Sequence, residues 1–254
     1  MGLRSRLRFL FAAAAVACGM AARPAPGDDR SNVDDRFTVR TGLPYSEADR
    51  ALRLDLFLPK ETGCSVPCVI VIQGGGFRAQ NGQRFRPFAE HLAEHGMAAA
   101  LIAYRGRPDH KYRDTLADVK AAVRYVRKVG GQHNIAVDRI GAMGRSAGGT
   151  LAALLAVTGG MQEFEGAGGH SESSSRIQVA VAYAGVFDFV ARFTDHEQIA
   201  LQPRHKTKME TNGEWIGATF SRDDPDWLAA SAFRHVDKDD PPVLFLHCKN
   251  DTTV

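Results

Sequence analysis

The chain has 254 residues, of which 44% are hydrophobic, 24% charged and 8% aromatic, the proportions of an ordinary globular protein. Its formal net charge is +3, and that excess comes from three arginines in residues 1–22, which contain no acid. The composition excludes a disordered or collagen-like chain, and the balanced charge of the remainder gives no argument for a nucleic-acid partner.

Residues 1–22 have the pattern of a secretory signal peptide: a basic start, an apolar run over 9–17 and small residues over 19–22. The run is too short for an integral membrane span. Because the segment ending at Cys18 resembles a lipobox, a lipoprotein stays open as an alternative to a cleaved leader. We therefore expect a secreted or periplasmic protein, with the polar residues 23–35 as a linker.

Residues 36–254 are expected to form one α/β domain. Residues 37–40 and 52–58 alternate apolar and polar side chains, which is typical of antiparallel strands at a sheet edge. Continuous apolar runs indicate strands buried on both faces, at 69–72, 97–104, 140–143, 179–183 and 243–246. Helical spacing lies between them, at 87–95, 115–129 and 146–157. The alternation predicts a doubly wound, mostly parallel sheet with an antiparallel N-terminal edge.

Two segments depart from this alternation. Residues 159–175 are rich in Gly, Ser and Glu, and predict an exposed insertion loop. Residues 191–235 contain Trp215 and Trp227 and give mixed signals. They are expected to form either a cap excursion or irregular surface helices.

The most specific motif is Gly144-Arg145-Ser146-Ala147-Gly148, in which a predicted strand runs directly into a predicted helix. In this context G-x-S-x-G is typical of a nucleophile elbow, where the serine hydroxyl projects at the carboxyl end of the sheet. The amides of the following helix favour negative charge that develops beside that hydroxyl. Ser146 is therefore the candidate nucleophile.

A glycine loop follows the strand at 69–72. Its residues are Gln73-Gly74-Gly75-Gly76-Phe77. Acyl transfer passes through a tetrahedral oxyanion that needs two or three donors aimed at one point. The amides of Gly75, Gly76 and Ala147 are the predicted donors.

Together these segments resemble the α/β-hydrolase family, in particular esterases and lipases with an H-G-G-G loop, and most closely the branch of feruloyl and acetylxylan esterases. The resemblance extends from about Leu52 through the Tyr104-Arg105 pair and Asp118 to the end of the chain. The segment 247–254 resembles the family's H-G-x-x-D-x-x-V pattern, and this resemblance implies that Asp251 is the acid of the triad. Two residues depart from the family: Gln73 replaces a histidine, and Cys248 replaces a glycine.

The resemblance also implies a catalytic histidine after the acid, one strand further on. It is therefore expected beyond Val254, and the chain is expected to be incomplete at its C-terminus, without the last strand and helix of the fold. Alternative assignments of the acid, the base and a metal site stay open. Asp188 is a competing acid, His247 a competing base, and His91 with His95 a helical pair that would suit a metal.

The expected function is that of an exported serine esterase that acts on a small-molecule or polysaccharide ester, with acetyl or feruloyl groups as the analogy suggests. No cofactor or metal is implied. The alternatives are a general short-chain carboxylesterase, a peptidase-like hydrolase, or a non-catalytic binding protein if the chain ends at Val254. In an exported chain Cys64 and Cys68 are expected either to pair locally or to stay free.

Overall fold

The computed structural model describes residues 36–60 and 62–254. The predicted signal peptide (1–22) and linker (23–35) lie outside the described residues. Among the described residues, no helix has both the length and the hydropathy needed to cross a lipid bilayer.

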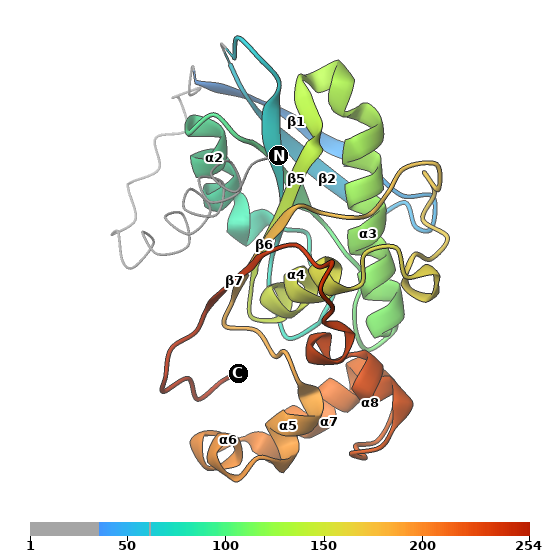
Figure 1. Cartoon of the computed structure of the whole chain (residues 1–254), viewed down its shortest axis with the longest axis vertical. Coiled ribbons are helices and arrows are strands. Elements are labelled where there is room, and N and C mark those ends of the chain that lie inside the picture. The colour runs from blue at the N-terminus through green and yellow to red at the C-terminus, as the bar shows by residue number, and fades with distance from the viewer. Residues whose placement is uncertain (1–35, 61) are drawn as a thin grey trace.

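One sheet of seven strands organises the structure, in the order β1-β2-β4-β3-β5-β6-β7 (Figure 1). β1 pairs antiparallel with β2, and β2 with β4, whereas all later pairs are parallel. The predicted mostly parallel sheet with an antiparallel N-terminal edge is confirmed. The strands are β1 (Phe37–Pro44), β2 (Arg53–Pro59), β3 (Val66–Ile72), β4 (Ala98–Ile102), β5 (Ile135–Arg145), β6 (Val179–Tyr183) and β7 (Val243–Leu246).

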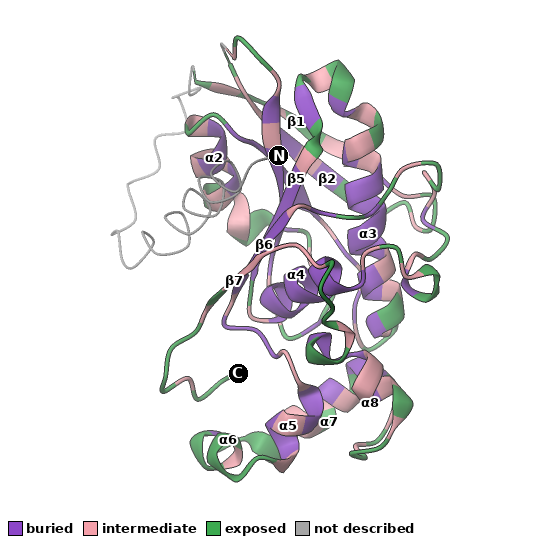
Figure 2. Cartoon of the chain, viewed as in Figure 1, coloured by how far each residue is buried: buried purple, intermediate pink, exposed green. Residues whose placement is uncertain are grey.

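Helices cover the central strands on both faces, so these strands need apolar residues at successive positions. Ile70 and Ile72 pack in a core with α3 (Tyr112–Val129) and α4 (Ala147–Val157), whereas Val69 and Val71 pack in a second core with α2 (Arg86–Glu94). Figure 2 shows this buried interior along the strands. Short 3₁₀ helices accompany these elements: η1 (Gln83–Phe85), η2 (Gly130–His133) and η3 (Gln162–Phe164).

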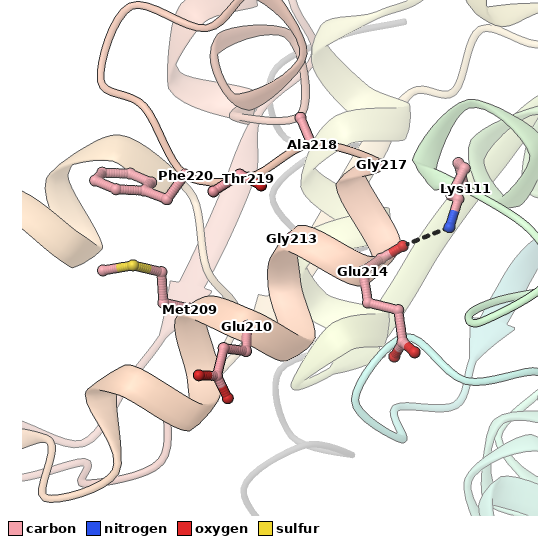
Figure 3. A pocket seen from close by; sticks show the side chains of 9 residues that line it. All are labelled: Lys111, Met209, Glu210, Gly213, Glu214, Gly217, Ala218, Thr219 and Phe220. Atoms are coloured by element: carbon pink, nitrogen blue, oxygen red, sulfur yellow. Dashed lines mark hydrogen bonds between the residues drawn. The ribbon is translucent and has the colours of Figure 1, made fainter.

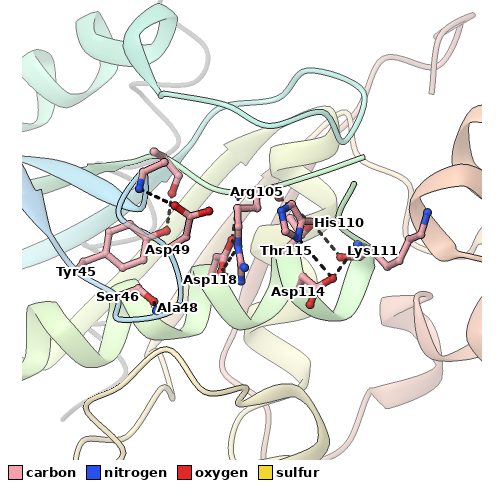
Figure 4. Close-up of polar contacts among 12 residues, drawn as sticks. Tyr45, Ser46, Ala48, Asp49, Arg105, His110, Lys111, Asp114, Thr115 and Asp118 are labelled. Atoms are coloured by element: carbon pink, nitrogen blue, oxygen red, sulfur yellow. Dashed lines mark hydrogen bonds and ion pairs between the residues drawn. The ribbon is translucent and has the colours of Figure 1, made fainter. Parts of the chain in front are cut away.

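α3 begins earlier than its predicted start at residue 115, because polar contacts fix its first turn. The Lys111 amide donates to the Asp114 carboxylate at 3.0 Å, so the helix begins at Tyr112. One turn further on, Asp118 is 1% exposed and accepts hydrogen bonds from the backbone and the guanidinium of Arg105 (Figure 4). Asp118 and Arg105, both within the resemblance, therefore join the end of β4 to α3.

The segment 159–175 is mostly exposed or half-buried, as its composition predicts, but a few buried residues anchor it. Phe164 is 1% exposed, and Glu165 bonds to two cations of α3. The ammonium of Lys120 lies 2.9 Å from one Glu165 oxygen, and the Arg124 guanidinium lies 2.5 Å from the other. Since both cations are buried, this ion cluster anchors the segment to the body of the protein.

Residues 189–235 form short helices at the carboxyl end of the strands (Figure 1). Trp215 and Trp227 are both fully buried, and Trp215 stacks on Phe77 from the glycine loop, with ring centroids 3.8 Å apart. The segment therefore shares the main hydrophobic core, and its role as a cap stays a prediction. Its helices are α5 (Phe189–Thr194), α6 (His196–Leu201), α7 (His205–Ile216), α8 (Pro225–Ala229) and η4 (Ala232–His235).

Candidate active site

Ser146 occupies the sharp turn between β5 and α4. Its φ of 56° and ψ of −129° lie in a region that L-residues rarely adopt. The turn is held from both sides, because the Ser146 amide donates to the Tyr183 carbonyl at 2.8 Å and its carbonyl accepts from the Thr150 amide at 3.0 Å. Ser146 is half-buried. This is the backbone that the G-x-S-x-G motif predicts.

Two glycines beside Ser146 are required by close backbone contacts. A Cβ atom on Gly148 would lie 2.1 Å from the carbonyl oxygen of Ile72, and one on Gly144 would lie 2.2 Å from that of Gly148. No side chain fits at such distances. The small residues of the motif therefore let β3, β5 and α4 meet at the turn.

The glycine loop after β3 lies directly against this turn. A Cβ atom on Gly74 would lie 2.1 Å from the Arg145 carbonyl oxygen and 3.0 Å from the Ser146 Cβ. Gly75 and Gly76 follow at once, and Ala147 begins α4 and is buried. The structure thus brings the predicted nucleophile and the predicted oxyanion loop together.

Gln73, which stands where the resembled family usually has histidine, is buried and anchors the start of the glycine loop. It is 2% exposed; its side-chain amide nitrogen donates to Gln80, and its side-chain oxygen accepts from the Arg84 amide at 2.8 Å. Its carbonyl accepts from the Tyr104 hydroxyl at 2.5 Å. Burial raises the pKa of that hydroxyl, so it stays protonated as a donor. Both polar atoms of the Gln73 side chain and its carbonyl are therefore hydrogen-bonded.

Asp251 lies after β7, where one of its carboxylate oxygens accepts two backbone hydrogen bonds and the other accepts none from the described residues. Oδ1 accepts from the amides of Thr253 and Val254 at 2.7 and 3.0 Å. Oδ2 lies 3.8 Å from His247 Nε2. The competing acid Asp188 instead caps α5, since its Oδ1 accepts from two amides of that helix at 2.9 Å. Since both carboxylates accept two amide hydrogen bonds through Oδ1, these contacts do not separate Asp251 from Asp188, and Asp251 as the acid stays a prediction.

Sequence reasoning missed Arg192, which lies beside Asp251 in a cavity of about 370 Å³. Arg192 is 3% exposed, and its Nη2 donates to the Thr253 carbonyl at 2.9 Å. Burial lowers the pKa of Arg192 to about 10, and the Asp251 carboxylate opposes this shift. A charged residue within the apolar stretch Phe189–Phe193 was the available signal. Arg192 therefore joins the segment after β7, which contains Asp251 and Thr253, to α5.

A groove of about 540 Å³ runs along α7 (Figure 3). Met209 and Phe220 give it apolar walls, and Glu210 and Glu214 add carboxylates. At one end the Lys111 ammonium donates to the Glu214 carbonyl at 2.9 Å. Ser146 is not among the residues that line this groove or the cavity beside Asp251.

The predicted helical histidine pair lies on α2, with the second core on the opposite sheet face from α3 and α4. His91, Glu94 and His95 place potential metal ligand atoms within 4.8 Å of one another. However, Glu94 already pairs with Arg36 at 3.0 Å, and His95 Nδ1 contacts the His91 carbonyl at 2.8 Å. These contacts are typical of a solvent-exposed helix face and do not favour a metal centre.

The three cysteines in the described residues are all free thiols. Cys64 is exposed and Cys68 is buried, so no local disulfide joins them. Burial raises the pKa of Cys68 to about 12. Cys248 is exposed, so its side chain is accommodated at the surface.

The strand order, the elbow at Ser146 and the glycine loop beside it define a protein of the α/β-hydrolase fold. Residues 54–254 match the BD-FAE family model, and the chain belongs to that family. The resemblance found in the sequence is thereby confirmed.

Curated relatives of the chain are ester hydrolases. One, from Mycobacterium tuberculosis, is named "Probable carboxylic ester hydrolase LipM"; it is 32% identical over 84% of this chain and 48% of its own length. "Esterase LipQ" from the same organism is 27% identical over 86% of this chain and 51% of its own length. The chain spans about half the length of these relatives.

Solved structures show the same fold. A "Truncated form of carbohydrate esterase from gut microbiota" is 28% identical, with a TM-score of 0.74 over 87% of this chain and 80% of that one. An esterase from Thermogutta terrifontis, Est2, solved with butyrate bound, is 26% identical, with a TM-score of 0.66 over 87% of this chain and 74% of that one.

Proposed function

We propose that the protein is a serine esterase that hydrolyses carboxylic esters through an acyl-enzyme. One observation carries the proposal: Ser146 sits on a strained turn, φ 56°, directly against a loop of three glycines. The two features follow different strands, β5 and β3, and meet at the carboxyl end of the sheet. Acyl transfer requires both, a nucleophile and donors for the oxyanion.

In this mechanism the Ser146 Oγ attacks the ester carbonyl carbon, and its proton passes to a histidine. The amides of Gly75, Gly76 and Ala147 stabilise the oxyanion that forms. The intermediate collapses, the alcohol leaves with a proton from the histidine, and water then releases the acid and regenerates Ser146. Asp251 orients the histidine through its available Oδ2. Among the described residues, no side chain hydrogen-bonds to Ser146 Oγ, and the base itself is not assigned.

For the substrate we propose an acetylated or feruloylated polysaccharide, met by the protein after export. Support comes from the carbohydrate esterase named above and from an "acetyl ester-xyloside bifunctional hydrolase" of Caldicellulosiruptor lactoaceticus, 26% identical with a TM-score of 0.64. The bound butyrate of Est2 favours a second candidate, a short-chain carboxylesterase. Export itself is tested by the N-terminus of the mature protein, which we expect after Ala21 or Ala22.

The deciding experiment is labelling of the purified protein with a fluorophosphonate, with Ser146→Ala as the control. We expect rapid labelling of the wild type only. Labelling of both proteins, or of neither, contradicts the proposal, and ligand binding without labelling points to a binding protein. Release of acetate from acetylated xylan or of ferulate from feruloylated xylan then supports the polysaccharide substrate. Turnover of only p-nitrophenyl acetate and butyrate favours the short-chain esterase.

A further inference from the structure

The glycine loop has a backbone that needs external support. Gly76 and Phe77 both have a φ of 61°, so two consecutive residues are left-handed, and the second has a side chain. Such a conformation persists only when the surrounding structure determines it. The contacts of this loop therefore show what holds the predicted oxyanion donors in place.

Arg107 supports the loop through the carbonyl groups of Gly76 and Phe77. Its Nε donates to the Gly76 carbonyl at 2.7 Å, and its backbone amide donates to the Phe77 carbonyl at 2.9 Å. The Arg107 side chain is only 9% exposed, and its guanidinium is paired with the carboxylate of Glu214 on α7. Glu214 thus fixes the arginine that fixes the loop.

The next residue of α7 supports the loop a second time. The Trp215 ring stacks on Phe77 with an angle of 14° between the planes. The indole Nε1 of Trp215 donates to Thr115 Oγ1 at 3.0 Å, which ties this ring to α3. Two consecutive residues of α7 therefore hold two consecutive residues of the loop.

The side-chain contact of Arg107 acts on the peptide plane between Gly76 and Phe77. In a trans peptide the carbonyl of Gly76 and the amide N–H of Phe77 lie in one plane and point in opposite directions. Holding that carbonyl fixes the orientation of the plane next to the Gly76 amide. The arginine touches no predicted reacting atom, so any effect that it has on the reaction passes through the loop.

We propose that Arg107 and Glu214 are positioning residues for the oxyanion loop, so that helix α7 sets the geometry of the transition-state donors. This inference rests on the proposed function. Donors displaced by a fraction of an ångström lose transition-state stabilisation but little ground-state binding, because the oxyanion exists only in the transition state and intermediate. The signature is a fall in kcat at nearly constant KM.

The test compares Arg107→Gln and Glu214→Gln with Arg113→Gln in the hydrolysis of p-nitrophenyl acetate. Arg113 is a matched control, because it pairs with Asp226 of α8 at 3.6 Å and has no contact with the loop. We expect Arg107→Gln to lower kcat by about tenfold or more, with KM within about twofold, since small displacements of catalytic groups have large effects on rate. Arg113→Gln is expected to stay within about twofold of the wild type.

Two further variants separate positioning from folding. Arg107→Lys keeps the charge beside Glu214 and is expected to recover part of kcat. The double variant Arg107→Gln/Glu214→Gln is expected to lose no more than Arg107→Gln alone, because Glu214 acts through the arginine. If Arg107→Gln does not fold, as judged by its tryptophan fluorescence, Glu214→Gln is the deciding variant, since that side chain is 41% exposed.

The outcomes separate this inference from the function on which it rests. A wild type that neither turns over ester nor reacts with fluorophosphonate overturns both. A wild type that is active while Arg107→Gln and Glu214→Gln keep its kcat overturns the positioning role alone. Additive losses in the double variant, or losses confined to KM, also contradict it.

Discussion

Replacement of Glu165 by Gln tests the ion cluster that anchors the segment 159–175. The Glu165 side chain is 17% exposed, while those of Lys120 and Arg124 are 0% and 4% exposed. Glutamine has nearly the same shape, but it is neutral and turns an NH₂ donor toward one of the two cations. Removing one partner of a buried ion pair costs about 3–5 kcal/mol. We expect a loss of this size at pH 7, a large share of the about 5–15 kcal/mol that stabilise a typical domain.

The pH dependence provides a second test of Glu165. Although burial alone would raise its pKa, hydrogen bonds from Ser175 and Lys120 lower the pKa of Glu165 below its ordinary value. A depressed acid pKa adds stability above the unfolded pKa of about 4.3, and this stability is lost as the pH falls through the folded pKa. The difference between wild type and Glu165→Gln should therefore be constant near neutral pH and shrink below about pH 4.

Urea unfolding at pH 7, 5 and 3.5 measures both effects. Glu172→Gln is the matched control, because Glu172 pairs with Lys128 at 3.2 Å on the exposed side of the same segment. We expect no measurable change in its midpoint. A penalty for Glu165→Gln below about 1 kcal/mol, as for a surface pair, or one that does not vary with pH, would refute the argument that a buried ionic cluster holds this segment.

Three other predictions concern the elbow and the thiols. Gly148→Ala should lower the free energy of unfolding by about 3 kcal/mol or more, because its Cβ would lie 2.1 Å from a carbonyl oxygen of β3; a thermal midpoint near the wild-type value would contradict the model of the turn. Ser146→Gly should be more stable than Ser146→Ala by about 1 kcal/mol, since only glycine relaxes the positive φ, and equal urea midpoints would argue against strain. Iodoacetamide should modify Cys64 and Cys248 in the folded protein and Cys68 only after unfolding, as mapped by mass spectrometry; early modification of Cys68 would contradict its burial and its raised pKa.

Much of the fold could be predicted from the sequence, because its signals are local. The apolar run at 69–72 has to be buried on both sides, and the alternation at 52–58 indicates a strand with one apolar face, although Phe57 on the other face is also buried. The elbow at Ser146 could also be predicted, because its backbone conformation depends on the nearby Gly144 and Gly148. The first residues of β5, from Ile135, were missed because charged Asp138 and Arg139 interrupt their apolar pattern.

The features that escaped prediction depend on partners distant in sequence. The composition of 159–175 predicts an exposed loop but not the ion cluster that anchors it, because nothing near Glu165 in the sequence reveals its contacts with Lys120 and Arg124. The contact of Arg107 with Glu214 spans more than a hundred residues. Arg192 carried a signal, a charge among apolar residues, but its neighbour Thr253 could be found only in three dimensions.

The aromatic core of residues 189–235 has a consequence for how this part of the molecule moves. Phe189, Trp215 and Trp227 have no exposed surface, and exposing each ring to water would cost about 4 kcal/mol or more. Lifting the segment off would thus cost about as much as unfolding a whole domain. Amide hydrogens at the buried end of α7, those of Trp215 and Ile216, should exchange with solvent only at the rate set by global unfolding. The segment is therefore expected to move with the body of the domain and not as a hinged lid.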